Sequence, residues 1–350
     1  MTPPLAAVAA CILALAATSD IARAQEEKNS TPLPSHLPLG VDACFGQVYD
    51  ARHLQAHPKQ RVASFHIFRD FTPDPTLEFE PDSREQMIEN DGSNGRVNVT
   101  AYVRFRDRKG VFSNGLTCGS GDGGKTFCFI DCDGGSFNLR PSGSSLILDN
   151  NGFVVVGGCG ASEEEEERTE YVTPGTDDRT FRLDRQPLAQ CVGLRDAQAP
   201  AWAKLGKPLR LRFDSQRATC HTRSYDAAHL RAHPQQAVKR IAVLNPRKEP
   251  ASGSDNDMPN YRFIVRVETK NGQTYERPIN CEPERYTYIC TSPEPASDGS
   301  HFFYLTRAGD DIMLRDRKGV LASFLGAKLG ADDQMFKLPL ASEDDCSLQK

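Results

Sequence analysis

The sequence predicts a mostly β protein built from two tandem copies of a small antiparallel β-barrel-like (or sandwich) domain. Each copy is expected to open with a short capped helix and to be stapled by disulfides. Three observations support this fold class. A long segment recurs along the chain, the cysteines fall at matching places in the two halves, and short apolar-polar alternations are separated by turn residues. These features indicate a duplication, a disulfide framework and antiparallel strands.

The N-terminus predicts export. Residues 5–17 form an apolar run that is too short to span a bilayer but suits the hydrophobic region of a signal peptide. Ala22 and Ala24 then supply the small-x-small pattern of a cleavage site, so we expect residues 1–24 to be removed. The mature protein is therefore expected to be secreted or periplasmic. Residues 25–43 begin with a stretch rich in Glu, Pro and Ser, which is typical of a flexible lead-in.

The duplicated segment predicts a short helix at the start of each domain. Residues 49–62 read YDARHLQAHPKQRV and residues 225–238 read YDAAHLRAHPQQAV, so ten of fourteen positions are identical. The Asp of this motif is a good N-cap, because its carboxylate can accept hydrogen bonds from the free N–H groups of the first turn. The preceding Tyr can pack on the Leu of the next turn, and the Pro ends the helix.

Strands are expected after the helix in both halves. Residues 99–107 alternate apolar with polar side chains, and their counterpart, residues 261–269, precedes the hairpin pair Asn271–Gly272. The first half has four further strand segments between glycine-rich turns, namely residues 125–132, 136–140, 146–149 and 153–157. This spacing is typical of an antiparallel meander closed as a barrel or packed as a sandwich. We favour the barrel, because a bridge between the first and last cysteines of each copy would join the outer elements.

The matched cysteines suggest domain boundaries. We expect a first copy over residues 44–191, a linker over residues 192–219 and a second copy over residues 220–346. Domains of this size can each bury a hydrophobic core. The single tryptophan of the chain, Trp202, falls in the linker, and we expect it to pack between the domains.

The cysteines predict a symmetric disulfide pattern. Cys11 leaves with the signal peptide, and an even number in an exported chain favours disulfides over metal ligation. Any pairing within one half should recur in the other, which predicts the bridges Cys44–Cys191, Cys118–Cys128, Cys220–Cys346 and Cys281–Cys290. Cys132 and Cys159 occur in the first half alone and are expected to pair with each other.

Charge and hydropathy exclude two classes of partner. The net charge is −5 and the basic residues are scattered, whereas nucleic-acid binding needs a concentrated basic surface. We therefore expect no nucleic-acid partner. Beyond the N-terminus no apolar run approaches the length of a membrane-spanning helix, so no transmembrane anchor is expected.

The repeated helix also carries the candidate metal residues. Asp50, His53 and His57 fall on one helical face, and the second copy repeats this set as Asp226, His229 and His233. Two imidazoles and a carboxylate could hold zinc or iron. In the structural interpretation, which we favour, the Asp caps the helix, the histidines fix it to the barrel, and the Pro forces the second His out of the helical conformation. No cofactor is then expected, and zinc or iron is the alternative.

Other motifs give weaker indications. Residues 119–126 satisfy the pattern of a phosphate-binding loop, but they lead into a strand instead of a helix. The glutamate run at residues 163–167 is expected to be a solvated loop, and Asp131 and Asp133 are expected to lie in a tight turn. No G-x-S-x-G sequence is present and the halves share no nucleophile–base pair, so we assign no catalytic residue.

The sequence therefore favours an exported, non-enzymatic binding module that recognises an unknown protein or envelope ligand in the cell envelope or outside the cell. Two copies of one module would suit bivalent binding. The first alternative is a metal-binding protein or metal-dependent enzyme that uses the repeated Asp/His/His face. The second is an envelope hydrolase with an interdomain site.

Overall fold

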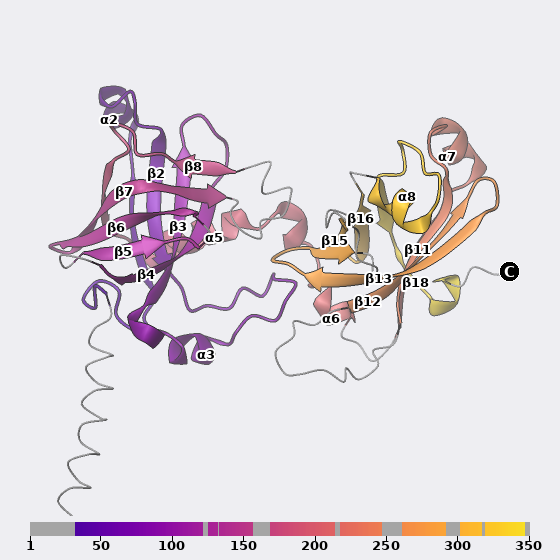
Figure 1. The fold of residues 1–350 in the computed structure, drawn as a ribbon, viewed down its shortest axis with the longest axis horizontal. Helices are drawn as coiled ribbons and strands as arrows, with labels where there is room; N and C mark the ends of the chain where they lie inside the picture. Colours follow the sequence, from indigo (N-terminus) through magenta and orange to yellow (C-terminus); the bar gives the residue numbers. More distant parts are fainter. Residues whose placement is uncertain are drawn as a thin grey trace, which may run out of the picture. The chain divides into compact units, whose positions relative to one another are not determined.

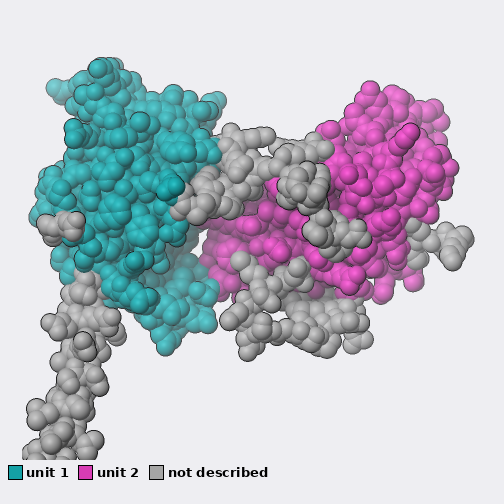
Figure 2. Space-filling model, in the orientation of Figure 1, with its two compact units in different colours: residues 1–73, 82–198 teal, residues 74–81, 199–350 magenta. Residues whose placement is uncertain are grey.

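The computed structural model describes residues 32–121, 125–131, 133–156, 169–213, 218–246, 261–291, 302–316 and 319–346. The chain divides into two compact units, which Figure 2 distinguishes by colour. Unit 1 comprises Met1–Pro73 and Asp82–Gln198, and unit 2 comprises Asp74–Pro81 and Ala199–Lys350. A short segment from the first half of the sequence therefore belongs to the second unit.

Unit 1 is a closed antiparallel barrel (Figure 1). Its sheet order is β6-β5-β4-β3-β2-β1-β9-β7-β8, and an additional pairing of β6 with β7 closes the ring and leaves β8 as a side strand. The strands are β1 Ala43–Val48, β2 Val62–Arg69, β3 Val97–Phe105, β4 Phe112–Ser120, β5 Thr126–Phe129, β6 Gly135–Ser142, β7 Ser145–Val156, β8 Glu170–Val172 and β9 Thr180–Arg185. The helices are α2 Ala51–Ala56, α3 Arg84–Glu89, the 3₁₀ turn η1 Ser93–Gly95 and α5 Leu188–Gln198.

Unit 2 repeats this meander in a nearly closed form. Its order is β17-β16-β15-β14-β13-β12-β11-β10-β18. Its strands are β10 Thr219–Ser224, β11 Val238–Asn245, β12 Tyr261–Thr269, β13 Thr274–Pro283, β14 Tyr288–Thr291, β15 Phe302–Ala308, β16 Asp311–Arg315, β17 Met335–Leu338 and β18 Leu340–Ala341. Its helices are η3 Ala201–Lys204, α6 Arg210–Phe213, α7 Ala227–Ala232, α8 Val320–Leu325 and η4 Glu343–Cys346. The pair β17–β18 takes the place of β9, since β17 pairs with β16 and β18 pairs with β10.

The predicted fold class is confirmed, and the barrel is the correct alternative. One strand differs from expectation. Residues 146–149 and 153–157 were expected as two strands around a turn, but β7 runs through both. Gly152, with a φ of 96°, bends the strand there, while the Asn150 amide donates to the carbonyl oxygens of Val172 and Asp178. The chain therefore bends at these residues and does not reverse direction.

Both barrels are filled by their own side chains. In unit 1 the inward positions of the strands bury Phe45, Phe65, Phe137, Phe153 and Phe181. The Phe65 ring lies 5.2–6.3 Å from three of the other rings, between ring centroids. In unit 2, Phe213, Phe263 and Tyr288 form a similar group. Small barrels are commonly filled in this way, and the filled interior places any ligand surface on the outside.

The core also includes chain that was expected to be flexible or to link the domains. Leu37, within the expected lead-in, is fully buried in the unit 1 core. Leu209 and Phe213, within the expected linker, are buried in the unit 2 core, and the linker residues before Ala199 continue helix α5. Periodic apolar residues are too few in these short turns to reveal a core role from sequence. The guanidinium of Arg315 lies over the Trp202 ring, 5.9 Å from the ring centroid, and both residues belong to unit 2.

Among the described residues, four disulfides have the predicted pairing: Cys44–Cys191, Cys118–Cys128, Cys220–Cys346 and Cys281–Cys290. The expected Cys132–Cys159 bridge, the signal peptide and the glutamate run lie outside the described residues. Four disulfides are typical of proteins that fold in an oxidising compartment. In the described part of the chain, no helix has the length and apolar character needed to cross a membrane.

Candidate functional site

The repeated motif forms a short capped helix with a ladder of rings. Asp50 Oδ1 accepts a hydrogen bond from the backbone N–H of His53 at 2.7 Å, so the predicted N-cap is confirmed. The His53 ring stacks between Tyr49 and His57, with centroid separations of 4.5 and 4.1 Å. His57 ends the helix at φ −121° and ψ 72°, outside the helical region, as expected for a residue before proline.

The second copy reproduces this geometry closely. Asp226 Oδ1 accepts from the N–H of His229 at 2.7 Å. The His229 ring lies between Tyr225 and His233 at centroid separations of 4.6 and 4.4 Å. Two copies that have diverged elsewhere therefore keep the same cap and the same stack.

A glutamine links each ladder to its barrel. His53 Nε2 lies 3.0 Å from Gln60 Oε1, and the buried Gln60 amide donates to the carbonyl of Val62 on β2. Gln236 makes the same two contacts, with His229 and with Val238 on β11. The shared Gln of the motif is thus the partner that the sequence reasoning did not assign to the histidines.

A buried carboxylate holds the start of the next strand. Asp178 accepts hydrogen bonds from the backbone N–H groups of Arg61 and Val62 at 2.6 and 3.2 Å. Asp333 does the same for Ala237 and Val238 at 2.7 and 3.2 Å. In the sequence, Asp178 and Asp333 each follow another aspartate, Asp177 and Asp332. Their contact with the helix–strand junction depends on how each barrel closes.

These contacts account for the candidate metal residues. The carboxylate of each Asp faces backbone N–H groups, and the first His of each set is bonded to Gln. His57 Nδ1 lies 2.9 Å from the carbonyl oxygen of His53. Within the described residues, no three His, Cys, Asp or Glu side chains are grouped so that they could hold a metal ion. Burial raises the pKa of Tyr49 to about 12, so this phenol stays neutral at ordinary pH.

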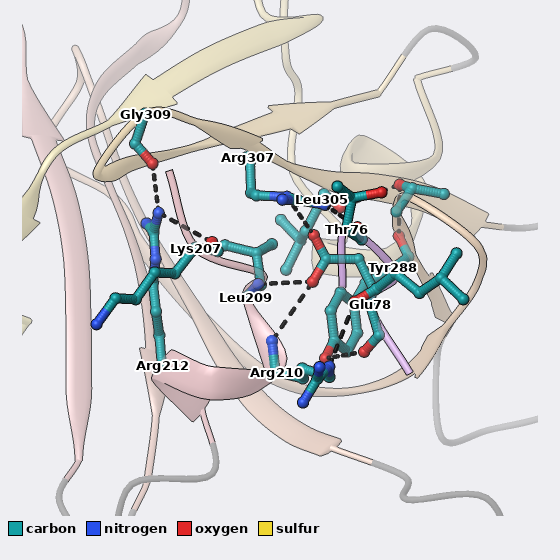
Figure 3. Close-up of polar contacts among 12 residues, drawn as sticks. Thr76, Glu78, Lys207, Leu209, Arg210, Arg212, Tyr288, Leu305, Arg307 and Gly309 are labelled. Atoms are coloured by element: carbon teal, nitrogen blue, oxygen red, sulfur yellow. Dashed lines mark hydrogen bonds and ion pairs between the residues drawn. The ribbon is translucent and has the colours of Figure 1, made fainter. Parts of the chain in front are cut away.

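Unit 2 contains a buried ion pair, drawn in Figure 3. Arg307 Nε lies 2.7 Å from Glu78 Oε1, and both side chains are almost fully buried. Glu78 Oε2 accepts the backbone N–H groups of Leu209 and Arg210 at 2.6 and 3.4 Å. Burial raises the pKa of Glu78, while the Arg307 guanidinium and these N–H groups act to lower it.

The peptide backbone around Glu78 is held as firmly as its carboxylate. The Tyr288 hydroxyl donates to the Glu78 carbonyl at 3.3 Å, and Arg307 Nη2 donates to the Thr76 carbonyl. Figure 3 shows these bonds reaching Thr76 and Glu78, and they join residues 74–81 to unit 2. The carboxylate, the guanidinium and the phenol of this cluster each contact another group of unit 2, so the cluster is a packing element of that unit.

Each barrel also contains a buried histidine with a lowered pKa. His66 on β2 faces Gly46 on β1, and its Nε2 lies 3.0 Å from the Gln190 amide of α5. Burial, together with the Arg104 charge, lowers the pKa of His66 to about 4. His221 on β10 occupies a different position, and burial lowers its pKa to about 4 as well. In the described part of the chain, neither ring has a serine or cysteine side chain as a hydrogen-bond partner.

One hydroxyl–imidazole contact exists near the start of unit 1. Ser35 Oγ lies 2.9 Å from His36 Nδ1. The other ring nitrogen of His36 faces the backbone carbonyl of Gly143 at 3.0 Å, where a catalytic triad would need a carboxylate. This contact fixes residues 35–36 to the barrel.

A groove of about 340 Å³ lies on the outer surface of unit 1, across strands β2 to β5. We call it the β2–β5 groove. Its lining residues are Phe68, Asp70, Asn98, Val99, Thr100, Gly115, Leu116, Thr117, Phe129, Ile130 and Asp131. Outward side chains form two cross-strand rows, one of Phe68, Thr100 and Gly115 and one of Asn98, Thr117 and Phe129. Asp131, expected in a tight turn, stands at one end of the groove.

The groove exists because one outward position has no side chain. Gly115 is exposed on β4, and a Cβ placed there would meet no atom within 4 Å. Glycine inside a strand often marks a bulge, a tight bend or a place where a ligand or another backbone approaches closely. On one side helix α5 covers Phe68, which is buried with Tyr102 and Leu194. On the other side Phe127 and Phe129 stack on the outer surface of β5, with centroids 5.9 Å apart and planes inclined by 18°.

The residues that shape this groove are replaced at the equivalent place of unit 2. The paired cysteines Cys118–Cys128 and Cys281–Cys290 fix the alignment of the two strand pairs. Counting from them, Pro278 takes the place of Gly115, and Ile289 and Thr291 take the places of Phe127 and Phe129. The glycine and the two phenylalanines at the groove are therefore found in the first copy and not at the matching positions of the second.

Sequence reasoning missed the groove, although a signal was present. Residues 126–129 read Thr-Phe-Cys-Phe, and a cysteine bridged to the neighbouring strand points into the barrel. The two-residue period of a strand then places both phenylalanines on the outside, which is unusual for large apolar side chains. The literal phosphate-loop pattern, residues 119–126, overlaps the end of β4 and the first residue of β5, and its residues 122–124 lie outside the described part.

The chain matches no protein-family model, no curated protein and no solved structure.

Proposed function

We propose that this chain is an exported, non-enzymatic binding protein of the cell envelope or the extracellular space, and that unit 1 binds the ligand at the β2–β5 groove. The observation that carries this proposal is the combination of a barrel interior filled by its own side chains with an open outer groove that packing does not require. A binding site on the outside of a rigid scaffold suits recognition, because a closed and disulfide-bonded barrel loses little entropy on binding.

The repeated polar residues support the same conclusion. The Asp, His and Gln groups shared by the two halves make hydrogen bonds within their own barrels. They serve the fold in both copies, which leaves recognition to surface residues that differ between them. The metal-dependent alternative would require the Asp/His/His set to release these contacts.

A sedimentation assay tests the proposal. The mature chain, without residues 1–24, is mixed with washed envelope preparations from the cells that produce it, and the pellet is assayed. We expect the chain to sediment, and to do so equally after treatment with a metal chelator. The variant Gly115→Gln, which fills the groove, should remain in the supernatant.

Two results would contradict the proposal. Failure of the unaltered chain to bind any envelope fraction would remove the binding role. Bound zinc or iron at about one ion per Asp/His/His set, found by elemental analysis of protein purified without a His-tag, would favour the metal-dependent alternative.

A further inference from the structure

We infer that the β2–β5 groove binds a neutral oligosaccharide chain, with one site per molecule. This inference rests on the proposed binding function and adds the chemical class of the ligand. It follows from the polar groups, the aromatic rings and the charge of the groove.

The floor of the groove presents hydrogen-bonding groups of the kinds that recognise sugar hydroxyls. Thr117 Oγ1 donates to Asn98 Oδ1 at 3.1 Å, which holds the Asn98 amide in one orientation. Its NH₂ group bonds to no described residue and can donate to a ligand, and Thr100 in the adjacent row adds a second hydroxyl. Amides and hydroxyls that both donate and accept match the alcohol groups of a sugar.

The aromatic pair beside these groups supplies an apolar platform. Phe127 is 40% exposed, and it stacks with Phe129 in a nearly parallel arrangement. The negative face of an aromatic ring attracts the polarised C–H groups on the flat face of a pyranose ring. The Arg96 guanidinium lies over the Phe129 ring, 5.7 Å from its centroid, where it brings hydrogen-bond donors to the platform and leaves the exposed Phe127 ring for the sugar.

The charge around the groove favours a neutral ligand. The Asp70 carboxylate is paired with Arg195 and also accepts the backbone N–H of Thr72. Arg96 and Asp131 contribute one charge of each sign. A nucleic acid or an acidic polysaccharide needs an excess of positive charge, which this surface does not provide.

The site is also held rigid from behind. Cys118 and Cys128 point inward from β4 and β5 and are bonded to each other, so Thr117 and Phe129 keep their register. Rigid placement reduces the entropy lost on binding. The strands β2 to β5 span about 14 Å at the usual strand spacing, which is long enough for a short oligosaccharide.

Isothermal titration of the mature chain with three neutral hexasaccharides tests the inference: chitohexaose, cellohexaose and maltohexaose. We expect at least one of them to bind with a stoichiometry of one per chain. The variants Phe129→Ala and Gly115→Gln should each weaken this binding by about tenfold or more. Gly115 has open space around it and no positive φ, so Gly115→Gln should fold normally, which a thermal melt will verify.

The second barrel provides the matched control. Thr291→Ala, at the position equivalent to Phe129, should leave the affinity unchanged. The inference fails if none of the hexasaccharides binds, if both groove variants bind as tightly as the unaltered chain, or if an acidic polysaccharide binds at the groove more tightly than the neutral ones. If envelope binding still depends on Gly115 while no hexasaccharide binds or competes, the binding function stands and the oligosaccharide assignment is wrong.

Discussion

Each barrel buries one residue of a short turn that precedes its first strand, but the side chain that donates to the carbonyl of this residue differs between the two barrels. In unit 1, Leu37 is fully buried and its carbonyl accepts from Arg69 at 2.6 Å. In unit 2, Phe213 is the buried residue and its carbonyl accepts from Asn245 at 3.0 Å. Leu37 and Phe213, and likewise Arg69 and Asn245, are 176 positions apart, the same offset as the repeated motif. The duplicated halves therefore keep a hydrogen bond between equivalent positions, but the donor is a charged Arg69 in unit 1 and a neutral Asn245 in unit 2.

The buried charges were then balanced locally. Arg69 is neutralised by Asp91 inside unit 1. Unit 2 has a neutral Asn245 at that place, and its own buried cation, Arg307, is neutralised by Glu78 from residues 74–81. The backbone geometry of this fold therefore tolerates different buried ion pairs, provided that each charge has a partner. It also shows that the second repeat of the sequence is not a complete structural unit, since it lacks residues 74–81.

The largest expected effect comes from breaking the ion pair of unit 2. Glu78→Ala leaves Arg307 buried without its counter-charge and should lower the free energy of unfolding of unit 2 by about 3–5 kcal/mol. Calorimetry of the full chain, resolved into two transitions, should show one transition moving while the other stays. The double variant Glu78→Leu with Arg307→Met should recover most of the loss. Equal shifts of both transitions would contradict the assignment of residues 74–81 to unit 2.

The buried histidines give a comparable effect that both barrels should share. The folded-state pKa of His66 and His221, about 4, lies below the ordinary value of 6.5. Between these values the unfolded chain binds protons that the folded chain does not, so stability is full above pH 6.5 and falls as the pH drops towards 4. Each histidine should contribute a slope of up to about 1.4 kcal/mol per pH unit in this window.

Denaturant titrations between pH 4 and pH 7 measure this slope. His66→Gln should flatten the pH dependence of unit 1 and leave that of unit 2 unchanged, and His221→Gln should do the reverse. If neither variant changes the slope of its own unit, the histidines are not responsible for the acid sensitivity.

A smaller change in stability is expected at a cross-strand pair whose residue sizes differ between the two barrels. His66 pairs with Gly46 across β1 and β2, whereas the equivalent pair of unit 2 is Ala242 with Thr222. A Cβ on Gly46 would lie 2.0 Å from Cδ2 of the His66 ring, so Gly46→Ala should destabilise unit 1 by about 1–3 kcal/mol. The double variant Gly46→Thr with His66→Ala copies the unit 2 pair. Its free energy of unfolding, measured by chemical denaturation, should be higher than that of Gly46→Ala. A lower value would contradict this explanation of the pair.

The smallest effect concerns the helix caps, where the two units should behave alike. Asp50→Ala removes the acceptor for the N–H of His53 and should cost about 1 kcal/mol, while Asp50→Asn should be nearly silent. Asp226→Ala and Asp226→Asn should give the same pattern in unit 2. A metal role would instead make Asn a poor substitute for the carboxylate, and severe loss with both substitutions would exclude simple capping.

Local chemistry let the sequence predict much of this fold. The N-cap, the proline that ends each helix and the strand alternation depend on neighbouring residues, so the helices at residues 51–56 and 227–232 could be placed from sequence alone. The cysteine pairs could be predicted because the duplication places cysteines at matching positions in the two halves, so that a pair in one half recurs in the other. The barrel followed because these bridges join the outer elements of each copy.

Only the tertiary structure decided the features that depend on which segments meet. Residues 74–81 carry no pattern that directs them to unit 2, because a single Glu finds its partner only when Arg307 is buried nearby. The turns at Leu37 and Phe213 are too short for apolar periodicity to reveal their burial. The groove likewise requires Gly115, Asn98 and Phe129 to stand side by side on three strands, and register between strands is set by barrel closure. The sequence by itself determined the helices, the strands and the disulfide pairs. The tertiary structure decided which of these segments lie next to one another. Side-chain contacts between distant segments depend on how the barrel closes and not on local preference.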